Sequence, residues 1–332
     1  MRIGLDAMGT NNSPCVEVEG AIEALKLLPP DFKIVLVGNR ILIESELEQY
    51  SGQWSTDRLN ISHASEQVLV EDSPARVLRK KPDSSIAVGL RLQKEGEIDA
   101  FISAGSTGAV MAGALLTLRR LKGVDRPCIG TVVPTSKGPL LLLDAGANVD
   151  CKSHQMTQFA GLGKVYAQDL MGIRNPRIGL MNIGEEPEKG NDVTLATYRA
   201  LESSHLNFVG NIEGRVILDG TCDVLVCDGF VGNVVLKFYE SVANFISNLF
   251  REKMGGSSNS TDMKEVFKIL DYTETGGAPL LGVDGVVIIC HGSSPPKAIC
   301  NAIRVAAKAV EANMVSHFVE EINSFGKIGM VS

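Results

Sequence analysis

The chain has 332 residues, of which 44% are hydrophobic and 21% charged, the composition of a folded globular protein. Its net charge of −7 and its 5% of aromatic residues disfavour nucleic-acid binding, so we expect no nucleic-acid partner. Seven cysteines without a CxxC pair and five histidines without ligand spacing predict reduced thiols and no metal site. The early polar N-terminus and the lack of a long apolar run predict a cytoplasmic protein.

Strand-like and helical patterns alternate along the chain. In order, we expect a strand at 2–5, a helix after Ser13 and Pro14, a strand at 33–37, a helix at 41–47, a strand at 59–63, a helix at 84–92, a strand at 99–102 and a helix at 107–118. An antiparallel strand pair at 128–133 and 139–143 follows, then a helix at 155–168, a strand at 177–181, a helix at 193–201, strands at 207–212 and 224–227, a helix at about 233–253, a strand at 286–289 and a helix at 296–318.

This alternation predicts the fold class. Crossover helices must cover both faces of a mostly parallel sheet, so we expect a three-layer α/β/α fold in one domain, residues 1–332. A glycine- and serine-rich linker at 255–261 separates two helical segments. We therefore expect a helical hairpin at about 229–272 that projects from the domain.

Loops that combine glycine with short polar residues follow many of the strands, at 6–9, 103–108, 144–148, 182–186, 228–233 and 291–294. Ligands of open α/β sheets bind at the carboxyl ends of strands, although any one loop can also be a plain strand–helix turn. Their number favours an anion site at one sheet edge. The candidate phosphate or substrate ligands are Asp6, Ser103, Gly105, Ser106, Thr107, Gly108, Asp144, Asn148, Asn182, Glu185, Lys189, Asn191 and Ser293.

The loop at 103–108 is the best candidate phosphate cradle, because it joins an apolar strand to a helix of small residues. It lacks the Gly-Lys-Ser/Thr ending of a nucleotide-binding P-loop. The chain also lacks a GxGxxG after a strand, which argues against a dinucleotide site.

The candidate catalytic residues are Asp228, Asn233, Lys237 and His291. Asn233 and Lys237 share a helix face just after Asp228, so the three could orient an anionic substrate, or Lys237 could be a solvated surface residue. His291 lies in a polar turn before a helix N-terminus, where it could act as an acid or base or could cap the turn.

Two basic clusters stand out in this acidic chain. One is Arg79, Lys80 and Lys81, and the other is Arg119, Arg120, Lys122 and Arg126. Such clusters are either solvated faces or docking sites for an acidic partner.

A series of ordered motifs runs through the chain: Asp6-Ala7-Met8-Gly9, Ser103-Ala104-Gly105-x-Thr107-Gly108-Ala109, Asp125-Arg126-Pro127, Asp144-x-Gly146-Ala147-Asn148, Asn182-Ile183-Gly184-Glu185-Glu186, Lys189-Gly190-Asn191, Cys227-Asp228-Gly229-Phe230-Val231-Gly232-Asn233 and the segment 277–294. These motifs resemble the bacterial phosphate acyltransferases of phospholipid synthesis, the PlsX family. The resemblance spans about residues 1–310.

The resemblance implies a reaction in which acyl-[acyl-carrier protein] and inorganic phosphate give acyl phosphate and free carrier protein. A membrane glycerol-3-phosphate acyltransferase would then use the acyl phosphate. The resemblance also implies a fold similar to phosphate acetyltransferase and isocitrate dehydrogenase, a homodimer, and no metal or organic cofactor. Under this hypothesis the two basic clusters dock the acyl carrier protein.

Three departures from the family pattern affect these expectations. Thr10 and Asn11 stand where the family usually has Gly and Asp, and Ser106 replaces a usual Asn. The hairpin looks short, and in the family it is linked to peripheral membrane contact. Its apolar stripe at 242–250 is expected to be a dimer or core face, with membrane docking as the alternative.

The expected mechanism is direct attack of phosphate on the thioester. Donors near 106–108 or Asn233 would stabilise the oxyanion, and His291 or Lys237 would be the proton or charge partner. Two other classes stay open: a dehydrogenase of the related fold, and a non-enzymatic, lipid-associated scaffold.

Overall fold

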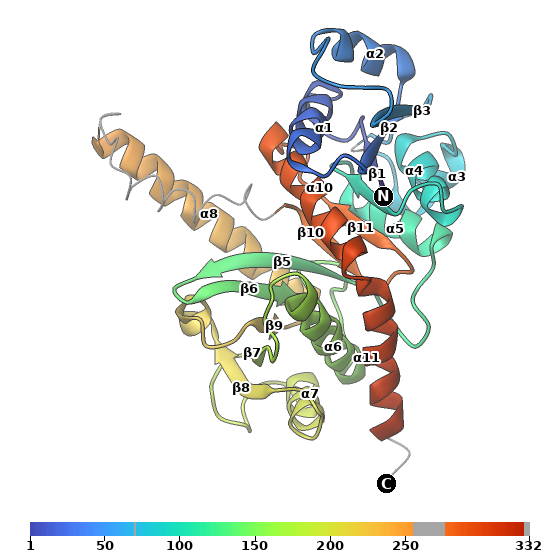
Figure 1. Ribbon diagram of the computed structural model, residues 1–332. Helices are drawn as coiled ribbons and strands as arrows, with labels where there is room; N and C mark the ends of the chain where they lie inside the picture. The colour runs from blue at the N-terminus through green and yellow to red at the C-terminus, as the bar shows by residue number, and fades with distance from the viewer. Residues whose placement is uncertain (70, 255–275, 329–332) are drawn as a thin grey trace. The chain divides into compact units, whose positions relative to one another are not determined.

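The computed structural model describes residues 1–69, 71–254 and 276–328, which group into two compact units (Figure 1). Unit 1 comprises Met1–Pro127 and Thr275–Glu320, and unit 2 comprises Cys128–Glu274 and Glu321–Ser332. The sequence predicts one domain, whereas the contacts divide the chain into these two units. Each unit has its own sheet and core.

Unit 1 is built on a sheet with the strand order β3-β2-β1-β4-β11-β10. Neighbouring strands are parallel except β10, which pairs antiparallel with β11. Helices α1 and α10 pack together on one face, and α4 packs with α5 on the other. The elements are β1 (Arg2–Asp6), α1 (Cys15–Leu27), β2 (Lys33–Gly38), α2 (Arg40–Glu48), β3 (Leu59–His63), α3 (Pro74–Lys80), α4 (Ser85–Lys94), β4 (Ala100–Ser103), α5 (Thr107–Thr117), β10 (Ala278–Leu281), β11 (Val286–Ile289) and α10 (Pro296–Glu311).

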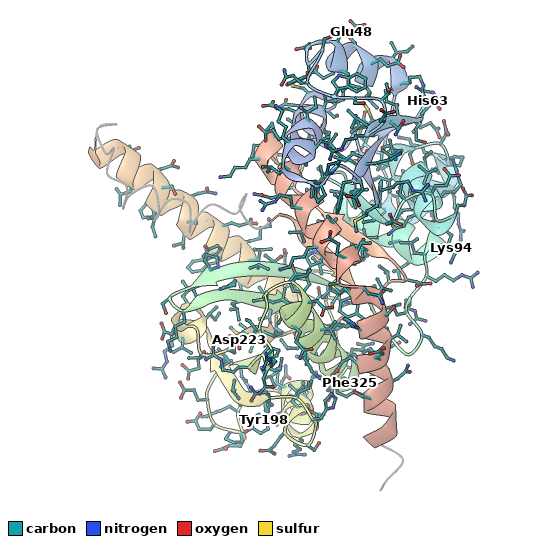
Figure 2. The ribbon with its side chains drawn as sticks, viewed as in Figure 1. Glu48, His63, Lys94, Tyr198, Asp223 and Phe325 are labelled. Atoms are coloured by element: carbon teal, nitrogen blue, oxygen red, sulfur yellow. The ribbon has the colours of Figure 1, made fainter. Side chains whose placement is uncertain are left out.

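Unit 2 has a sheet with the order β5-β6-β9-β7-β8, in which β5 is antiparallel to β6 and the other pairs are parallel. Asp223, labelled in Figure 2, accepts two hydrogen bonds from the Arg177 guanidinium and so ties the chain ahead of β7 to that ahead of β9. The elements are β5 (Cys128–Thr135), β6 (Gly138–Leu143), α6 (Ser153–Asp169), β7 (Ile178–Asn182), α7 (Asp192–Glu202), β8 (Phe208–Glu213), the 3₁₀ helix η1 (Gly214–Asp219), β9 (Val224–Val226) and α8 (Gly229–Met254). Helix α11 (Met314–Ile328) belongs to unit 1 up to Glu320 and to unit 2 from Glu321.

The predicted α/β fold, with mostly parallel strands covered on both faces, is confirmed, as is the antiparallel pair of β5 and β6. The expected final helix at 296–318 is wrong, because α10 ends at Glu311 and α11 begins at Met314. Asn313 adopts a left-handed φ of 54° between them, a conformation that ends helices and that asparagine tolerates. The short helix α3 and the strand β10 were not predicted.

The predicted hairpin begins with α8, and its linker and second segment lie outside the described residues. The apolar stripe is wrong as a core face, since Val242, Phe245 and Leu249 are all exposed. Phe230 (63% exposed), Phe238 (71%) and Phe245 (67%) lie on the same side of α8. We call this side, with Leu249, the apolar face of α8.

Among the described residues, none of the helices combines the length and the apolar content needed to cross a membrane.

Candidate functional site

Unit 1 brings three of the glycine-containing loops to one sheet edge. Strands β1, β4 and β11 are adjacent and parallel, so the loops at 6–9, 103–108 and 291–294 follow neighbouring strand ends. The Asn11 N–H donates to the Gly292 carbonyl at 2.8 Å, and the Cys290 N–H donates to the Ser103 carbonyl at 2.8 Å. The candidate ligands of these loops therefore lie at one edge of unit 1.

Asp6 is buried at the end of β1 and organises this edge. The Ser103 hydroxyl donates to its Oδ2 at 2.6 Å, and the Met8 N–H donates to its Oδ1 at 3.0 Å. The Gly105 N–H in turn donates to Ser103 Oγ at 3.0 Å. Burial raises the pKa of Asp6, and hydrogen bonds from Ser103, Ser85 and Met8 oppose that rise. Asp6 therefore positions the 103–108 loop from beneath.

The N-terminus of α5 offers free donors above Asp6. Ser106 precedes the helix and its side chain makes no capping hydrogen bond, so the first backbone N–H groups of α5 remain available to a ligand. Thr107 is exposed, and Gly105, Ser106 and Gly108 are half-buried. Such a terminus attracts an anion through its donors and its dipole.

Glycine at position 9 allows the loops at 6–9 and 103–108 to meet. A Cβ atom on Gly9 would lie 2.8 Å from the backbone nitrogens of both Ala104 and Gly105. Because those are backbone atoms, no side chain could move aside to make room.

Glu17 is a buried acid behind this edge that sequence reasoning missed. It is fully buried in α1, and its carboxyl group accepts the Thr10 N–H at 2.7 Å and the Thr10 hydroxyl at 3.0 Å. Burial raises its pKa to about 7, and the nearby Asp6 charge adds to the rise. The unusual Thr10 therefore supplies a hydroxyl that holds Glu17. A charged residue on an apolar helix face was the available signal.

His291 is exposed and hydrogen-bonded within its own turn. Its Nδ1 lies 2.7 Å from Ser293 Oγ, and the Ser293 N–H donates to the same ring nitrogen at 3.3 Å. The buried Ser294 hydroxyl accepts the His291 N–H at 3.1 Å. The geometry therefore favours the turn-capping role that the sequence left open.

Unit 2 gathers the other three loops in the same way, because β6, β9 and β7 are adjacent and parallel. Asp144, fully buried after β6, is the centre of its loop. Its carboxyl oxygens accept backbone N–H groups from Ile129, Gly146, Ala147 and Asn148, and the Asn148 side-chain amide donates at 2.8 Å. Burial raises the pKa of Asp144 and these donors oppose that rise. Asp144 and Asn148 thus shape the loop rather than face solvent.

The start of α8 packs against the Asp144 loop. The Asp228 carboxylate accepts the Val231 N–H at 2.8 Å, which explains why the helix begins at Gly229 rather than near 233. A Cβ atom on Gly232 would overlap the Asp144 carbonyl oxygen. Asn233 is exposed, with its Oδ1 3.5 Å from the Cβ position of Gly146.

Lys237 is also exposed, and its Nζ lies 2.8 Å from a Glu240 carboxylate oxygen. The structure thus favours the solvated alternative for Lys237. Asn233 remains beside the loop as a neutral donor.

The loop after β7 is held by its own amides. The Asn182 side chain donates to the Lys189 carbonyl at 3.0 Å, and Asn191 caps α7 by accepting the Thr194 N–H at 2.9 Å. Lys189 is exposed, and Glu185 lies 3.9 Å from Arg215 in an exposed pair. Asn182 and Asn191 therefore have clear structural roles, whereas the other two predicted ligands of this loop, Glu185 and Lys189, present charge to solvent.

The two basic clusters lie at the same end of a packed helix pair in unit 1. The Cβ position of Gly108 meets Pro74, and that of Gly113 meets Leu78, so α3 and α5 run parallel. Arg79 and Lys80 end α3, and Arg119 follows α5.

These cations differ in availability. All but Lys81 are exposed: Arg79, Lys80, Arg119, Arg120, Lys122 and Arg126. Lys81 is half-buried, pairs with Asp72 at 2.6 Å and donates to the Gln67 carbonyl, so it is wrong as a free docking cation. Arg120 pairs with Asp125 at 3.4 Å and is only partly available.

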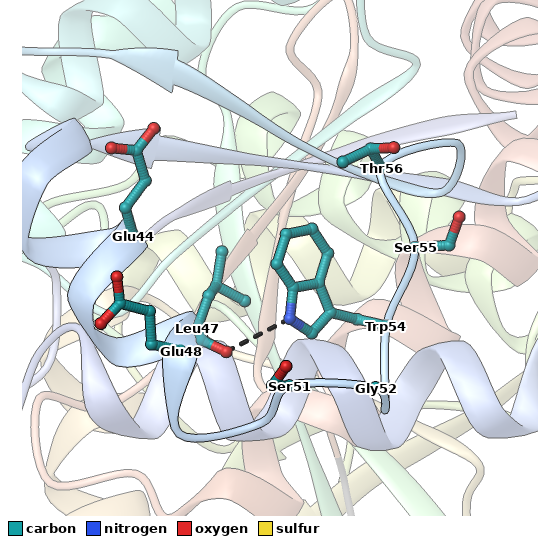
Figure 3. Close-up of a pocket in the computed structure, with 8 residues that line it drawn as sticks. All are labelled: Glu44, Leu47, Glu48, Ser51, Gly52, Trp54, Ser55 and Thr56. Atoms are coloured by element: carbon teal, nitrogen blue, oxygen red, sulfur yellow. Dashed lines mark hydrogen bonds between the residues drawn. The ribbon is translucent and has the colours of Figure 1, made fainter.

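A separate hollow of about 660 Å³ lies between α2 and the segment before β3 (Figure 3). The Trp54 indole N–H donates to the Leu47 carbonyl at 3.2 Å, and Glu44 and Glu48 stand beside it. The hollow is at the amino end of β3, opposite the strand-end loops. Its carboxylates would repel phosphate, so it is not the candidate phosphate site.

The fold places the chain among α/β proteins that share the architecture of the phosphotransacetylases. The chain superposes on the EutD phosphotransacetylase of Staphylococcus aureus with a TM-score of 0.59, covering 93% of this chain and 94% of that one at 13% identity. A branched-chain phosphotransacylase from Enterococcus faecalis gives a TM-score of 0.60 at 14% identity, over 93% and 99% of the two chains. This likeness establishes the fold.

Sequence comparison identifies the family within that class. The chain belongs to the family described as fatty acid synthesis protein, whose model matches residues 1–317. A phosphate acyltransferase of Heliobacterium modesticaldum is 49% identical over 330 residues, covering 97% of this chain and 98% of its own. One from Thermoanaerobacterium thermosaccharolyticum is 46% identical over 334 residues, at 98% of each chain. The resemblance to phosphate acyltransferases is confirmed.

Proposed function

We propose that this protein transfers a fatty acyl group from acyl-[acyl-carrier protein] to inorganic phosphate, forming acyl phosphate for phospholipid synthesis. The observation that carries the proposal is the match to phosphate acyltransferases along nearly the whole chain. The free donors at the start of α5 give phosphate a place to bind.

In the proposed reaction, phosphate lies against the backbone N–H groups of α5 near Ser106 and Thr107. A phosphate oxygen attacks the thioester carbonyl, and the carrier thiolate leaves. A thiol has an ordinary pKa of about 8.5, so it leaves with little help from an acid. The protein mainly holds the two substrates together, which can lower a barrier by roughly 7–11 kcal/mol. Asp6 and Ser103 act as positioning residues.

The acyl carrier protein docks, in this proposal, on the exposed cations at the ends of α3 and α5. These cations form a positively charged patch on a protein whose net charge is −7, and such a patch would attract an acidic partner. Helix α5 has 11 residues and is about 16 Å long, so the thioester must reach along the helix to its N-terminus. A carrier protein with a flexible prosthetic arm suits that distance.

The apolar face of α8 is, in this proposal, the surface on which two copies form a homodimer. Phenylalanine side chains this exposed are unusual unless a partner covers them. Peripheral contact with a membrane, where a glycerol-3-phosphate acyltransferase would take the acyl phosphate, is the alternative use of the same face.

The test is phosphate-dependent release of free thiol from palmitoyl-carrier protein by the purified protein. We expect release with phosphate and none with sulfate. Ser103→Ala should lower kcat/KM for phosphate, because Ser103 Oγ holds both Asp6 and the Gly105 N–H, whereas Ser51→Ala, in the separate hollow, should not. Vesicle binding without thiol release would instead support a lipid-associated scaffold and overturn the proposal.

A further inference from the structure

Glu17 is a buried acid of unit 1 to which the proposed reaction gives no part. It is fully buried in α1, one helical turn before Gly20. A Cβ atom on Gly20 would lie 2.7 Å from Ile299 Cβ and 2.8 Å from the Pro296 carbonyl oxygen, so α1 packs directly against α10. Because residues three apart share a helix face, this close packing fixes Glu17 on a rigid support.

The carboxyl group of Glu17 holds Thr10 at two points. One oxygen accepts the Thr10 N–H at 2.7 Å, and the other accepts the Thr10 hydroxyl at 3.0 Å. Thr10 is only 5% exposed, so water has little access to replace these bonds if they are lost. Asp6 holds the start of the same loop by accepting the Met8 N–H at 3.0 Å. The segment 8–10 is therefore held at both ends by buried carboxyl groups.

This segment meets the other two strand-end loops of unit 1. A Cβ atom on Gly9 would lie 2.8 Å from two backbone nitrogens of the 103–108 loop. The Asn11 N–H donates to the Gly292 carbonyl at 2.8 Å, and Asn11 Oδ1 lies 3.3 Å from the Cβ position of Gly292. A displacement of Thr10 would therefore move Gly9 and Asn11 on either side of it, and with them the contacts to both loops.

We propose that Glu17 is a positioning residue for phosphate, which acts through Thr10 on the loops at the start of α5. The inference rests on the proposed function, because it takes these loops to bind inorganic phosphate. Glu17 is buried and bonded to Thr10, so it does not touch phosphate itself. The carrier protein docks, in the proposed function, at the other end of α5. Loss of Glu17 should therefore weaken the use of phosphate and spare that of the carrier protein.

The test removes the two hydrogen bonds to Thr10 without leaving a charge. Glu17→Leu should raise KM for phosphate by about tenfold, because one lost hydrogen bond to a charged group costs about that factor in affinity. KM for palmitoyl-carrier protein should stay within about twofold of wild type. KM does not depend on the folded fraction, so partial unfolding cannot produce this difference between the substrates.

Glu17→Gln is the conservative variant and should keep the wild-type KM for phosphate at pH 6. Glutamine can accept the Thr10 N–H and donate to the Thr10 hydroxyl. Burial raises the pKa of Glu17 to about 7, so at pH 6 the wild-type side chain is mostly neutral, as glutamine is.

Thr10→Val removes the hydroxyl alone and should raise KM for phosphate in the same direction. Its combination with Glu17→Leu should cost little more than Glu17→Leu, because the two residues act as one unit. The matched control is Thr197→Val in unit 2. Thr197 is also fully buried and donates its hydroxyl to the Val193 carbonyl at 2.7 Å, and this variant should keep the wild-type KM for phosphate.

A ³¹P NMR titration with inorganic phosphate measures binding without the reaction and should show the same loss in Glu17→Leu. Three results would overturn the inference while leaving the proposed function intact: unchanged phosphate affinity in Glu17→Leu and Thr10→Val, an equal rise in KM for both substrates, or Glu17→Gln impaired as much as Glu17→Leu. Wild-type protein that binds phosphate but releases no carrier thiol would count against the proposed function alone. Wild-type protein that binds no phosphate would contradict both.

Discussion

Three buried carboxyl groups hold neighbouring loops in place through hydrogen bonds. They belong to Asp6, Glu17 and Asp144. Each accepts hydrogen bonds from backbone or hydroxyl donors, and burial raises the pKa of each. Asp6 and Asp144 lie at the ends of strands and were predicted as ligands, whereas Glu17 lies in a helix. The type of residue was visible in the sequence, but its role depended on which donors surround it.

Glu17 should make stability depend on pH. Its pKa is raised from 4.5 to about 7 in the folded protein, so the folded state holds a proton that the unfolded state releases. The contribution of Glu17 to the free energy of unfolding is therefore complete below about pH 4.5. It decreases by a total of about 3 kcal/mol as the pH rises toward 7, and it stays constant at higher pH.

Glu17→Gln should flatten that dependence, because an amide can accept the Thr10 N–H and donate to the Thr10 hydroxyl without titrating. Urea denaturation of both proteins at pH 5 and pH 8 measures the difference. An equal loss of stability in the variant would show that another group titrates.

At the scale of elements, the lack of a side chain at Gly232 allows α8 to pack closely against the Asp144 loop. Gly232→Ala should cost about 1–3 kcal/mol of unfolding free energy, since its Cβ would overlap a backbone carbonyl oxygen. The matched control is Gly214→Ala, whose Cβ would meet only Met181 Cε at 3.7 Å. That change should stay within about 0.5 kcal/mol. Similar losses in both would argue against the close packing at Gly232.

Element prediction succeeded where a local signal was strong. Apolar runs bounded by turn residues located β2, β4 and β11, and hydrophobic periodicity located α6 and α7. It failed at Asn313, where the helical pattern continues on both sides of one left-handed residue. It also missed β10, because a short strand containing Pro279 has a weak local signal and is stabilised by its pairing with β11.

The partners of individual side chains could not be predicted from the sequence, and the reason is physical. Lys81 looked like its neighbours Arg79 and Lys80, yet it turns back to Asp72 and the Gln67 carbonyl. Such contacts join segments whose approach is fixed only by the packed fold. Glycine-rich strand ends, by contrast, lie at a sheet edge by topology alone, so their grouping could be anticipated.

At the scale of the whole molecule, charge should govern association with the carrier protein. Reversal of Arg79 and Lys80 to glutamate should lower kcat/KM for acyl-carrier protein by about tenfold at low ionic strength, and by less at high salt. The control is Lys26→Glu in α1, on the other face of the unit 1 sheet. Equal effects of both variants, or an effect insensitive to salt, would place the docking site elsewhere.

The central claim is that inorganic phosphate itself accepts the acyl group. The direct measurement supplies ¹⁸O-labelled phosphate with palmitoyl-carrier protein and determines the mass of the acyl product. Attack by a phosphate oxygen predicts palmitoyl phosphate that retains all the label, with free carrier thiol formed in equal amount. Unlabelled palmitate, or an acyl group trapped covalently on the protein, would contradict direct transfer to phosphate.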